Sequence, residues 1–130
     1  MAHPNEDLVR AGYVAFGRGD VDALQHKFFA GDVRYHVPGK SPLAGDYKGV
    51  AQVLEWLGRQ FELSEGTIRA EVHDVVANDE HAVSLITVRA ERAGKQVVDN
   101  SVQVFHIRDG KVSEVWSHPA DLYAMDEFWS

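Results

Sequence analysis

The chain has 130 residues, of which 45% are hydrophobic and 25% charged, and its formal net charge is −7. This composition is typical of one globular domain, and the acidic balance argues against nucleic acid as a partner, because binding a phosphate backbone needs clustered Lys and Arg. Because the chain has no cysteine, it has no disulfide, thiolate nucleophile or zinc–thiolate site. Its N-terminus lacks the apolar stretch of a signal peptide, and no apolar segment is long enough to span a membrane, so we expect the protein to be cytoplasmic and outside the membrane.

The first half of the chain is predicted to be mainly helical. A first helix begins at an Asn5 cap, carries an apolar stripe through Phe16 and ends at the glycines that follow. Asp20 can cap a short second helix that continues through Lys27. A third helix is predicted from about Val50 to Leu63, where apolar residues form one stripe.

A short strand and a long loop separate the second and third helices. Val33, Tyr35 and Val37 alternate with polar residues, which predicts a strand. A loop rich in proline and glycine follows as far as Gly49. His36 stands just before this loop, so we expect it at the wall of a pocket whose rim the loop forms.

The second half of the chain changes to a period of two, which indicates strands. Four strands are predicted, followed by a short terminal helix, in the segments "TIRAEVHDVVA", "HAVSLITVRAER", "QVVDNSVQVFHIR", "KVSEVWSH" and "PADLYAMDEFW". Helices followed by an antiparallel meander predict an α+β fold over residues 1–130, in which a curved, cone-shaped antiparallel sheet wraps around N-terminal helices and encloses one pocket.

A two-residue turn at Asp109-Gly110 predicts which side chains share a sheet face. Counting outward from this turn pairs Ile107 with Val112, Phe105 with Glu114, Gln103 with Trp116, and Ser101 with His118. This face mixes aromatic and polar groups, so we assign it to the pocket, on condition that no bulge interrupts the hairpin. The opposite face, with Val102, Val104 and Val115, is predicted to make a homodimer because it needs cover.

Three segments resemble the SnoaL-like branch of the nuclear transport factor two-like superfamily. "FGRGDVDAL" is similar to the turn between its first two helices, "HVPGKSPLAGDYKG" to its strand–loop–helix entry, and "DGKVSEVWSHPADLY" to its last strand. The superfamily includes ketosteroid isomerases, polyketide cyclases and limonene epoxide hydrolases, but also binding and assembly proteins. The resemblance therefore implies the fold more specifically than the function.

The resemblance also assigns positions to family residues. His36 falls where ketosteroid isomerases carry a general-base Asp, and Gln103 where they hold an oxyanion-binding Asp. Their oxyanion Tyr falls on Gly12, one residue before Tyr13. Two of the three roles are changed, which makes steroid isomerisation improbable.

Two other mechanisms of the superfamily are also incomplete in this chain. The first two members of the epoxide hydrolase Asp-Arg-Asp set fall near Ile86 and Val88, which are both apolar. The last Asp, which cyclases also use as a base, falls on His118.

The candidate catalytic residues are two histidines and an aspartate. His36 or His118 could move a proton near neutral pH, and Asp121 could orient His118, although an Asp at that position more often caps a helix. The candidate substrate-binding residues are Tyr13, Phe16, Asp46, Trp56, Gln103, Phe105 and Trp116. Four histidines, His26, His73, His81 and His106, fall on different elements, and His36 with His118 lacks a third ligand, so no metal site is predicted. No cofactor is predicted either.

Three hypotheses follow for the function. The first is a cofactor-free isomerase, cyclase, dehydratase or hydrolase that uses histidine-mediated proton transfer on a small hydrophobic carbonyl or hydroxyl compound. The second is a protein that binds such a ligand without turnover. The third is a dimeric assembly module of the same fold.

Overall fold

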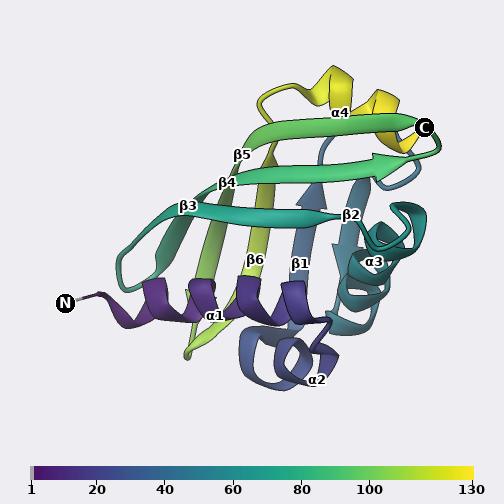
Figure 1. The fold of residues 1–130 in the computed structure, drawn as a ribbon. Coiled ribbons are helices and arrows are strands. Elements are labelled where there is room, and N and C mark those ends of the chain that lie inside the picture. The colour runs from purple at the N-terminus through teal and green to yellow at the C-terminus, as the bar shows by residue number, and fades with distance from the viewer. Residues whose placement is uncertain (1) are drawn as a thin grey trace.

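The structure is a computed structural model that describes residues 2–130. Four helices, a π-helical turn and six strands follow one another along the chain (Figure 1). In chain order they are α1 (Pro4–Arg18), α2 (Val21–Ala23), the π-helical turn η1 (Leu24–Phe28), β1 (Phe29–Val37), β2 (Gly45–Lys48), α3 (Val50–Leu63), β3 (Arg69–Ala77), β4 (His81–Arg92), β5 (Lys95–Arg108), β6 (Lys111–His118) and α4 (Leu122–Trp129).

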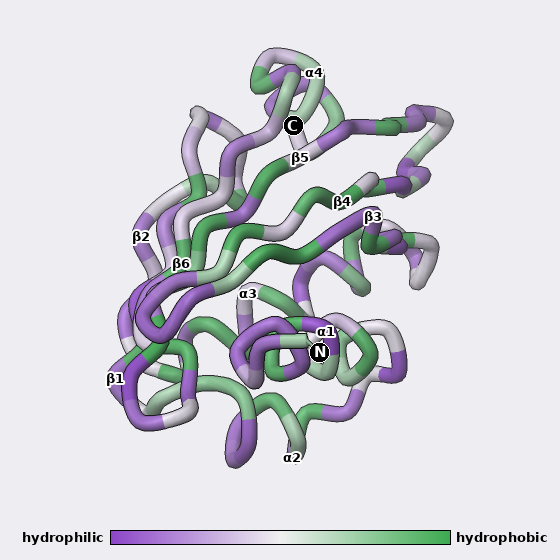
Figure 2. Tube along the Cα trace, turned by 90° about the vertical axis from the view of Figure 1, so that its left-hand side faces the viewer, coloured by the Kyte–Doolittle hydropathy of each residue, from purple (hydrophilic) through white to green (hydrophobic). Residues whose placement is uncertain are grey.

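The six strands form one sheet in the order β2-β1-β6-β5-β4-β3. The sheet curves around α1 and α3, and α4 lies at the end of the molecule opposite α2 (Figures 1 and 2). The predicted α+β class and its curved sheet around N-terminal helices are confirmed. One detail differs, because β1 and β6 are paired in parallel whereas all other neighbours are antiparallel.

The helix ends follow the local signals in the sequence. Gly19 ends α1 in a left-handed conformation with φ of 65°, which is the usual role of glycine after a helix. The side chain of Asp20 accepts a hydrogen bond from the Ala23 N–H and so caps α2. The cap of α1 is His3 rather than Asn5, since the His3 ring nitrogen Nδ1 accepts from the Asn5 N–H.

The core fills the concave side of the sheet. Val9 from α1, Val53 from α3, Val33 from β1 and Val115 from β6 are completely buried there. Phe128 and Trp129 bury the last turn of α4 against the same core. Among residues 2–130 no helix is both long and apolar enough to cross a membrane.

A bulge in the last hairpin changes the predicted register. The Asp109-Gly110 turn forms as expected, with positive φ at both residues, and Ile107 pairs with Val112. The register then shifts by one residue at Ser113, so Phe105 pairs with Val115 instead of Glu114. Side chains alternate between faces along a strand, and a shift of one residue therefore exchanges their faces.

Candidate functional site

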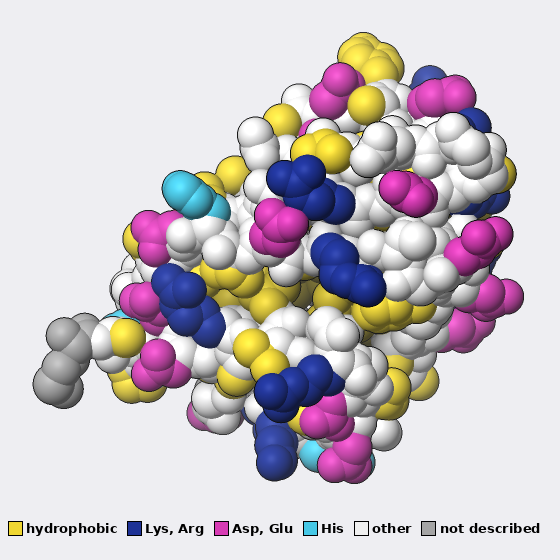
Figure 3. Space-filling view, in the orientation of Figure 1, with side chains coloured by type: hydrophobic (Ala, Val, Ile, Leu, Met, Phe, Trp, Pro, Cys, Tyr) yellow, Lys and Arg dark blue, Asp and Glu magenta, His cyan; other side chains and the backbone are white. Residues whose placement is uncertain are grey.

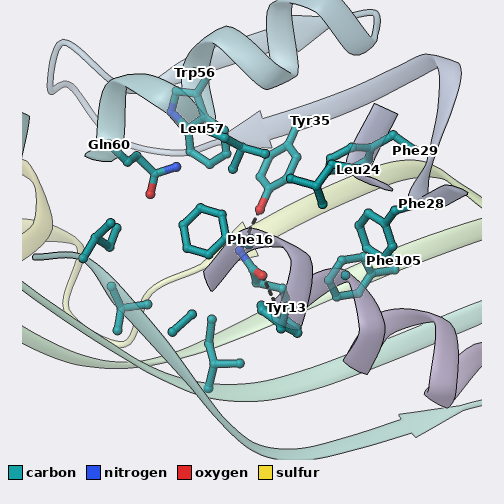
Figure 4. A pocket seen from close by; sticks show the side chains of 16 residues that line it. Tyr13, Phe16, Leu24, Phe28, Phe29, Tyr35, Trp56, Leu57, Gln60 and Phe105 are labelled. Carbon is teal, nitrogen blue, oxygen red and sulfur yellow. Dashed lines mark hydrogen bonds between the residues drawn. The ribbon is translucent and has the colours of Figure 1, made fainter. Parts of the chain in front are cut away.

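A cavity of about 80 Å³ lies between the concave face of the sheet, α1 and α3. Its walls are mainly aromatic and aliphatic (Figure 4). Polar groups in its lining belong to Tyr13, Tyr35, Gln60 and Gln103, together with the indole N–H of Trp56. The other lining residues are Gly12, Phe16, Leu24, Phe28, Phe29, Leu57, Ile68, Ala70, Ile86, Val88 and Phe105. Apolar walls with a few convergent polar groups are typical of small-molecule sites.

Four polar side chains form a directed hydrogen-bond chain at this cavity. The Tyr13 hydroxyl donates to Gln103 Oε1, and its oxygen lies 2.7 Å from the hydroxyl of Ser84. Because the single Tyr13 proton is used on Gln103, Ser84 must be the donor to Tyr13. Gln103 Nε2 then donates to the Tyr35 hydroxyl oxygen at 2.8 Å.

The chain ends on a hydroxyl proton that no other residue among 2–130 accepts. Tyr35 is the last member, and its oxygen already accepts from Gln103, so its own O–H remains available. This hydroxyl points into the cavity (Figure 4). The cavity therefore presents a hydrogen-bond donor to any ligand that brings an acceptor oxygen.

Both phenols at the site are neutral. Burial raises the pKa of Tyr13 and of Tyr35 above the ordinary tyrosine range. Ser84 is completely buried and Tyr35 is 5% exposed. Hydrogen bonds in such a water-poor setting are strong, because little solvent competes for the donors. The site can thus stabilise an oxygen atom that gains negative charge.

The β1–β2 loop and α3 hold Tyr35 in place. The ring of Tyr35 packs on Trp56 of α3, with ring centres 4.6 Å apart. Trp56 donates its indole N–H to the carbonyl of Leu43 at 3.1 Å, and the Tyr47 hydroxyl donates to the same carbonyl at 2.7 Å. These bonds tie the proline- and glycine-rich loop to the wall that carries Tyr35.

The cavity opens to the surface beside α1. A hollow with a hydrophobic floor lies between α1 and β3, and Lys and Arg side chains stand around it (Figure 3). A second cavity of about 70 Å³ lies beside the first, beneath α4 and the β1–β2 loop. The loop thus forms part of the pocket rim through Pro38, Ser41 and Leu43.

Five of the predicted substrate-binding residues line the first cavity. They are Tyr13, Phe16, Trp56, Gln103 and Phe105, which come from α1, α3 and β5. Gln103 has a larger structural role than the sequence indicated, because it connects the two tyrosines. Whether any of these residues touches a substrate stays a prediction.

His36 does not lie at the pocket wall, contrary to the prediction. Its neighbours Tyr35 and Val37 line the cavities, so its side chain points to the outer face of the sheet. There His36 Nδ1 lies 2.8 Å from Asp46 Oδ1, and Nε2 lies 2.6 Å from Glu114 Oε2. These hydrogen bonds, to Asp46 first and to Glu114 second, raise the pKa of His36.

Trp116 and His118 also lie outside the pocket because of the bulge at Ser113. Trp116 pairs with Val104 and stacks on His36, with ring centres 5.4 Å apart. His118 pairs with Val102 and is exposed. The same shift moves Val115 from the predicted outer face into the core. The predicted assignment of Trp116 and His118 to the concave face was therefore wrong.

Asp121 acts on the backbone in this structure. Its carboxylate accepts from the Ala124 N–H at 3.0 Å and caps α4. The preceding turn is held by buried Asp99, whose carboxylate accepts from the N–H groups of Ala120 and Asp121. The capping role that the sequence favoured for Asp121 is confirmed. Catalytic roles for His36, His118 and Asp121 remain untested predictions.

Three site residues were missed by the sequence interpretation. Tyr35 was interpreted only as an apolar strand residue. Because it is adjacent to His36 along a strand, its side chain must point to the sheet face opposite to that of His36. Gln60 lies on α3, near the apolar stripe, and reaches the cavity. Ser84 is a single polar residue inside a β4 segment that is otherwise mostly apolar, which is a signal for a buried hydrogen bond.

The arrangement offers donors and apolar surface rather than a metal site. Within residues 2–130 no three His, Asp or Glu side chains gather in a way that could hold a metal ion. The residues that line the first cavity include no histidine and no carboxylate. Its chemistry is therefore that of neutral hydroxyl and amide groups.

Comparison with known families matches residues 9–115 to the SnoaL-like domain. The chain belongs to the SnoaL-like family. An uncharacterised protein of Mycobacterium tuberculosis is 35% identical over 125 residues, which cover 95% of each chain. An uncharacterised protein of Mycobacterium bovis is similar to the same extent.

Solved structures support the same assignment. Bal32a, from a soil-derived mobile gene cassette, is 35% identical with a TM-score of 0.95, covering 99% of this chain and 98% of its own. A candidate polyketide cyclase from Xanthomonas campestris is 25% identical with a TM-score of 0.73, covering 95% of each chain. The proteins that this chain resembles thus include uncharacterised proteins and a candidate polyketide cyclase.

Proposed function

We propose that this SnoaL-like protein binds a small, largely hydrophobic molecule through one carbonyl or hydroxyl oxygen. The observation that carries the proposal is the direction of the hydrogen-bond chain, which leaves the Tyr35 proton free inside an apolar cavity. A ligand oxygen would accept this proton, and the aromatic walls would cover the remainder of the molecule.

Binding is better supported than histidine-mediated proton transfer. A general base must come within hydrogen-bond reach of the proton that it removes. His36 and His118 lie on the outer face of the sheet, whereas the cavity lies on the concave face. His36 is also occupied by Asp46 and Glu114.

A cyclase or isomerase activity is the second candidate. Its support is the similarity to a candidate polyketide cyclase and the neutral O–H donor of Tyr35, which suits an oxygen that becomes negative in a transition state. The cavity lining has no histidine or carboxylate, so the proton of an acidic substrate would pass to water while the Tyr35 O–H stabilises the oxygen that becomes negative. Chromatography of the compound recovered after binding separates the two candidates, because turnover changes the compound and simple binding returns it.

The test uses two flat molecules that differ in one oxygen. 1-Indanone carries a ketone, and indane is the same bicyclic hydrocarbon without it. We expect the wild type to bind the ketone roughly threefold to tenfold more tightly in calorimetric titrations, which is the usual value of one hydrogen bond. Tyr35→Phe should remove this preference and leave indane binding unchanged. Equal ketone preference in both proteins would contradict the proposal.

We also propose that the outer face of the sheet makes a homodimer. Val76, Leu85 and Val98 are between 41% and 58% exposed there, on β3, β4 and β5. Exposed apolar patches of this kind usually mark an interface. Sedimentation should show a dimer for the wild type and a monomer for Leu85→Lys. Val14→Lys, at a similarly exposed position on α1, should remain dimeric, and a monomeric wild type would refute the proposal.

A further inference from the structure

Two neighbouring cavities, called here the two chambers, share part of their lining. The first chamber is the cavity beside α1, and the second is the cavity beneath α4. Both chambers are lined by Trp56, Gln60, Val88 and Gln103, which form the boundary between them, called here the junction. Gln103 is also the residue that donates to Tyr35. A ligand oxygen held by Tyr35 would therefore lie next to the junction with the second chamber.

The volumes indicate that one molecule uses both chambers. They measure about 80 and 70 Å³, and each is about half of the roughly 150 Å³ cavity that encloses benzene in an engineered protein. A ring compound with a substituent would overfill either chamber alone, whereas a ring in the first chamber can extend into its opening at the surface beside α1. Its ring system would rest against the aromatic walls of the first chamber, and a substituent would pass through the junction.

The second chamber is more polar than the first. Ser41, Ser101, Ser117 and Asp126 contribute to its lining, together with the two amides of the junction. The hydroxyl of Ser117 and the amide of Gln60 make no side-chain hydrogen bond to other residues among 2–130. Gln103 has a second N–H that is not used on Tyr35. These groups could pair with hydroxyl or carbonyl oxygens of a ligand.

We propose that the ligand has two parts, a flat apolar ring with an acceptor oxygen and a short arm that bears a hydroxyl or carbonyl group. The ring occupies the first chamber and meets Tyr35. The arm extends under α4 toward Ser117 and Leu122, and both of these residues line the second chamber. This inference rests on the proposed binding of an oxygen-bearing ligand by Tyr35, and it adds the shape and polarity of the ligand.

The test adds arms to the same bicyclic ketone. Plain 1-indanone is compared with indanones that carry a propyl or a 3-hydroxypropyl arm, placed in turn at each free position of the six-membered ring. For one position, the hydroxypropyl compound should bind roughly fiftyfold more tightly than plain indanone, since three methylene groups are buried. The propyl compound should fall between them.

Two variants locate the arm, and a third is their control. Leu122→Trp fills the second chamber and should remove the gain from the arm, so that the armed compounds and plain 1-indanone bind equally. Ser117→Ala should make the propyl and hydroxypropyl compounds bind equally. Tyr123→Trp changes the neighbouring α4 residue, which is 89% exposed, and should keep the full gain. Urea unfolding of each variant establishes that it is folded.

The outcomes separate the two proposals. If plain 1-indanone binds but no armed compound binds more tightly, the inference of two chambers is wrong and the proposed function stands. The inference is also wrong if the gain survives in Leu122→Trp. If no indanone binds to the wild type, the proposed function fails, and the two-part ligand fails with it.

Discussion

Gly12 allows the close contact between α1 and the aromatic wall of the cavity. It lies inside α1 and lines the first chamber. A methyl group at this position would overlap the ring of Phe28, which is buried. The Phe28 ring has little room to move, since ring centres of Phe29 and Phe105 lie 4.7 and 6.3 Å away. We therefore predict that Gly12→Ala destabilises the protein and narrows the cavity.

The size of the effect follows from two opposing contributions. Alanine is favoured over glycine inside a helix by about 1 kcal/mol. Inserting a methyl group into a packed core costs about 1–3 kcal/mol. The contact with Phe28 is severe, so the cost should exceed the gain, and we expect a net loss of about 1 kcal/mol in the free energy of unfolding.

Gly17→Ala is a matched control on the same helix. No atom outside the local backbone lies within 4 Å of a methyl group built at Gly17, so only the helix preference acts there. It should therefore stabilise the protein by about 1 kcal/mol. In urea unfolding the two variants should differ by about 2 kcal/mol, or roughly 8 °C in Tm for a chain of this size.

Ligand binding gives a second result from the same variants. Gly12→Ala should weaken 1-indanone binding because the Phe28 ring is pushed into the first chamber, whereas Gly17→Ala should bind as the wild type does. If Gly12→Ala is as stabilising as Gly17→Ala and binds the ketone equally well, the packing of Phe28 against α1 has been misjudged.

Two further predictions concern stability. The raised pKa of His36 means that the folded state holds the histidine proton more tightly than the unfolded state does, and protonation therefore stabilises the fold. This stabilisation is complete below about pH 6.5, the ordinary pKa of histidine, and is lost as pH rises through the pKa of the folded state. The difference in unfolding free energy between the wild type and His36→Gln should therefore shrink from pH 6 to pH 9, and a difference that grows would contradict the ion pairs. Asp126 accepts from the backbone N–H groups of Lys40 and Ser41, so Asp126→Ala should cost about 1–2 kcal/mol in urea unfolding. Glu127→Ala, which removes only an exposed pair with Lys95, should cost less than about 0.5 kcal/mol, and equal losses would show that Asp126 does not hold the loop.

Local features of the fold could be predicted because they depend on neighbouring residues. The Asp20 cap, the left-handed Gly19 and the Asp109-Gly110 turn each rest on the chemistry of one or two positions. The β4 range was also found, since Asn78-Asp79 and Gly94-Lys95 mark the turns on either side of it. The short strand β2 was read as loop, because its four residues gain their order from pairing with β1.

The candidate site was only partly predictable because it depends on which face each strand presents. One extra residue at Ser113 exchanged the faces of Trp116 and Val115. A signal was present in the sequence, since the unbulged register placed charged Glu114 against Phe105 in the core. Val112 and Val115, which are three residues apart and both completely buried, record the same bulge. Tyr35 could have been found only after the face of His36 had been settled.

The carbonyl stretching frequency of bound 1-indanone tests the role of Tyr35 most directly. An infrared difference spectrum with ¹³C at the carbonyl would compare the wild type with Tyr35→Phe, and with Tyr47→Phe as a control, because that hydroxyl is used on Leu43. We predict a lower frequency in the wild type and in Tyr47→Phe, as expected for a carbonyl that accepts a hydrogen bond, and a frequency close to that in hydrocarbon solvent in Tyr35→Phe. The same frequency in all three proteins would show that the Tyr35 proton points to Gln103 rather than to the ligand, and would contradict the account.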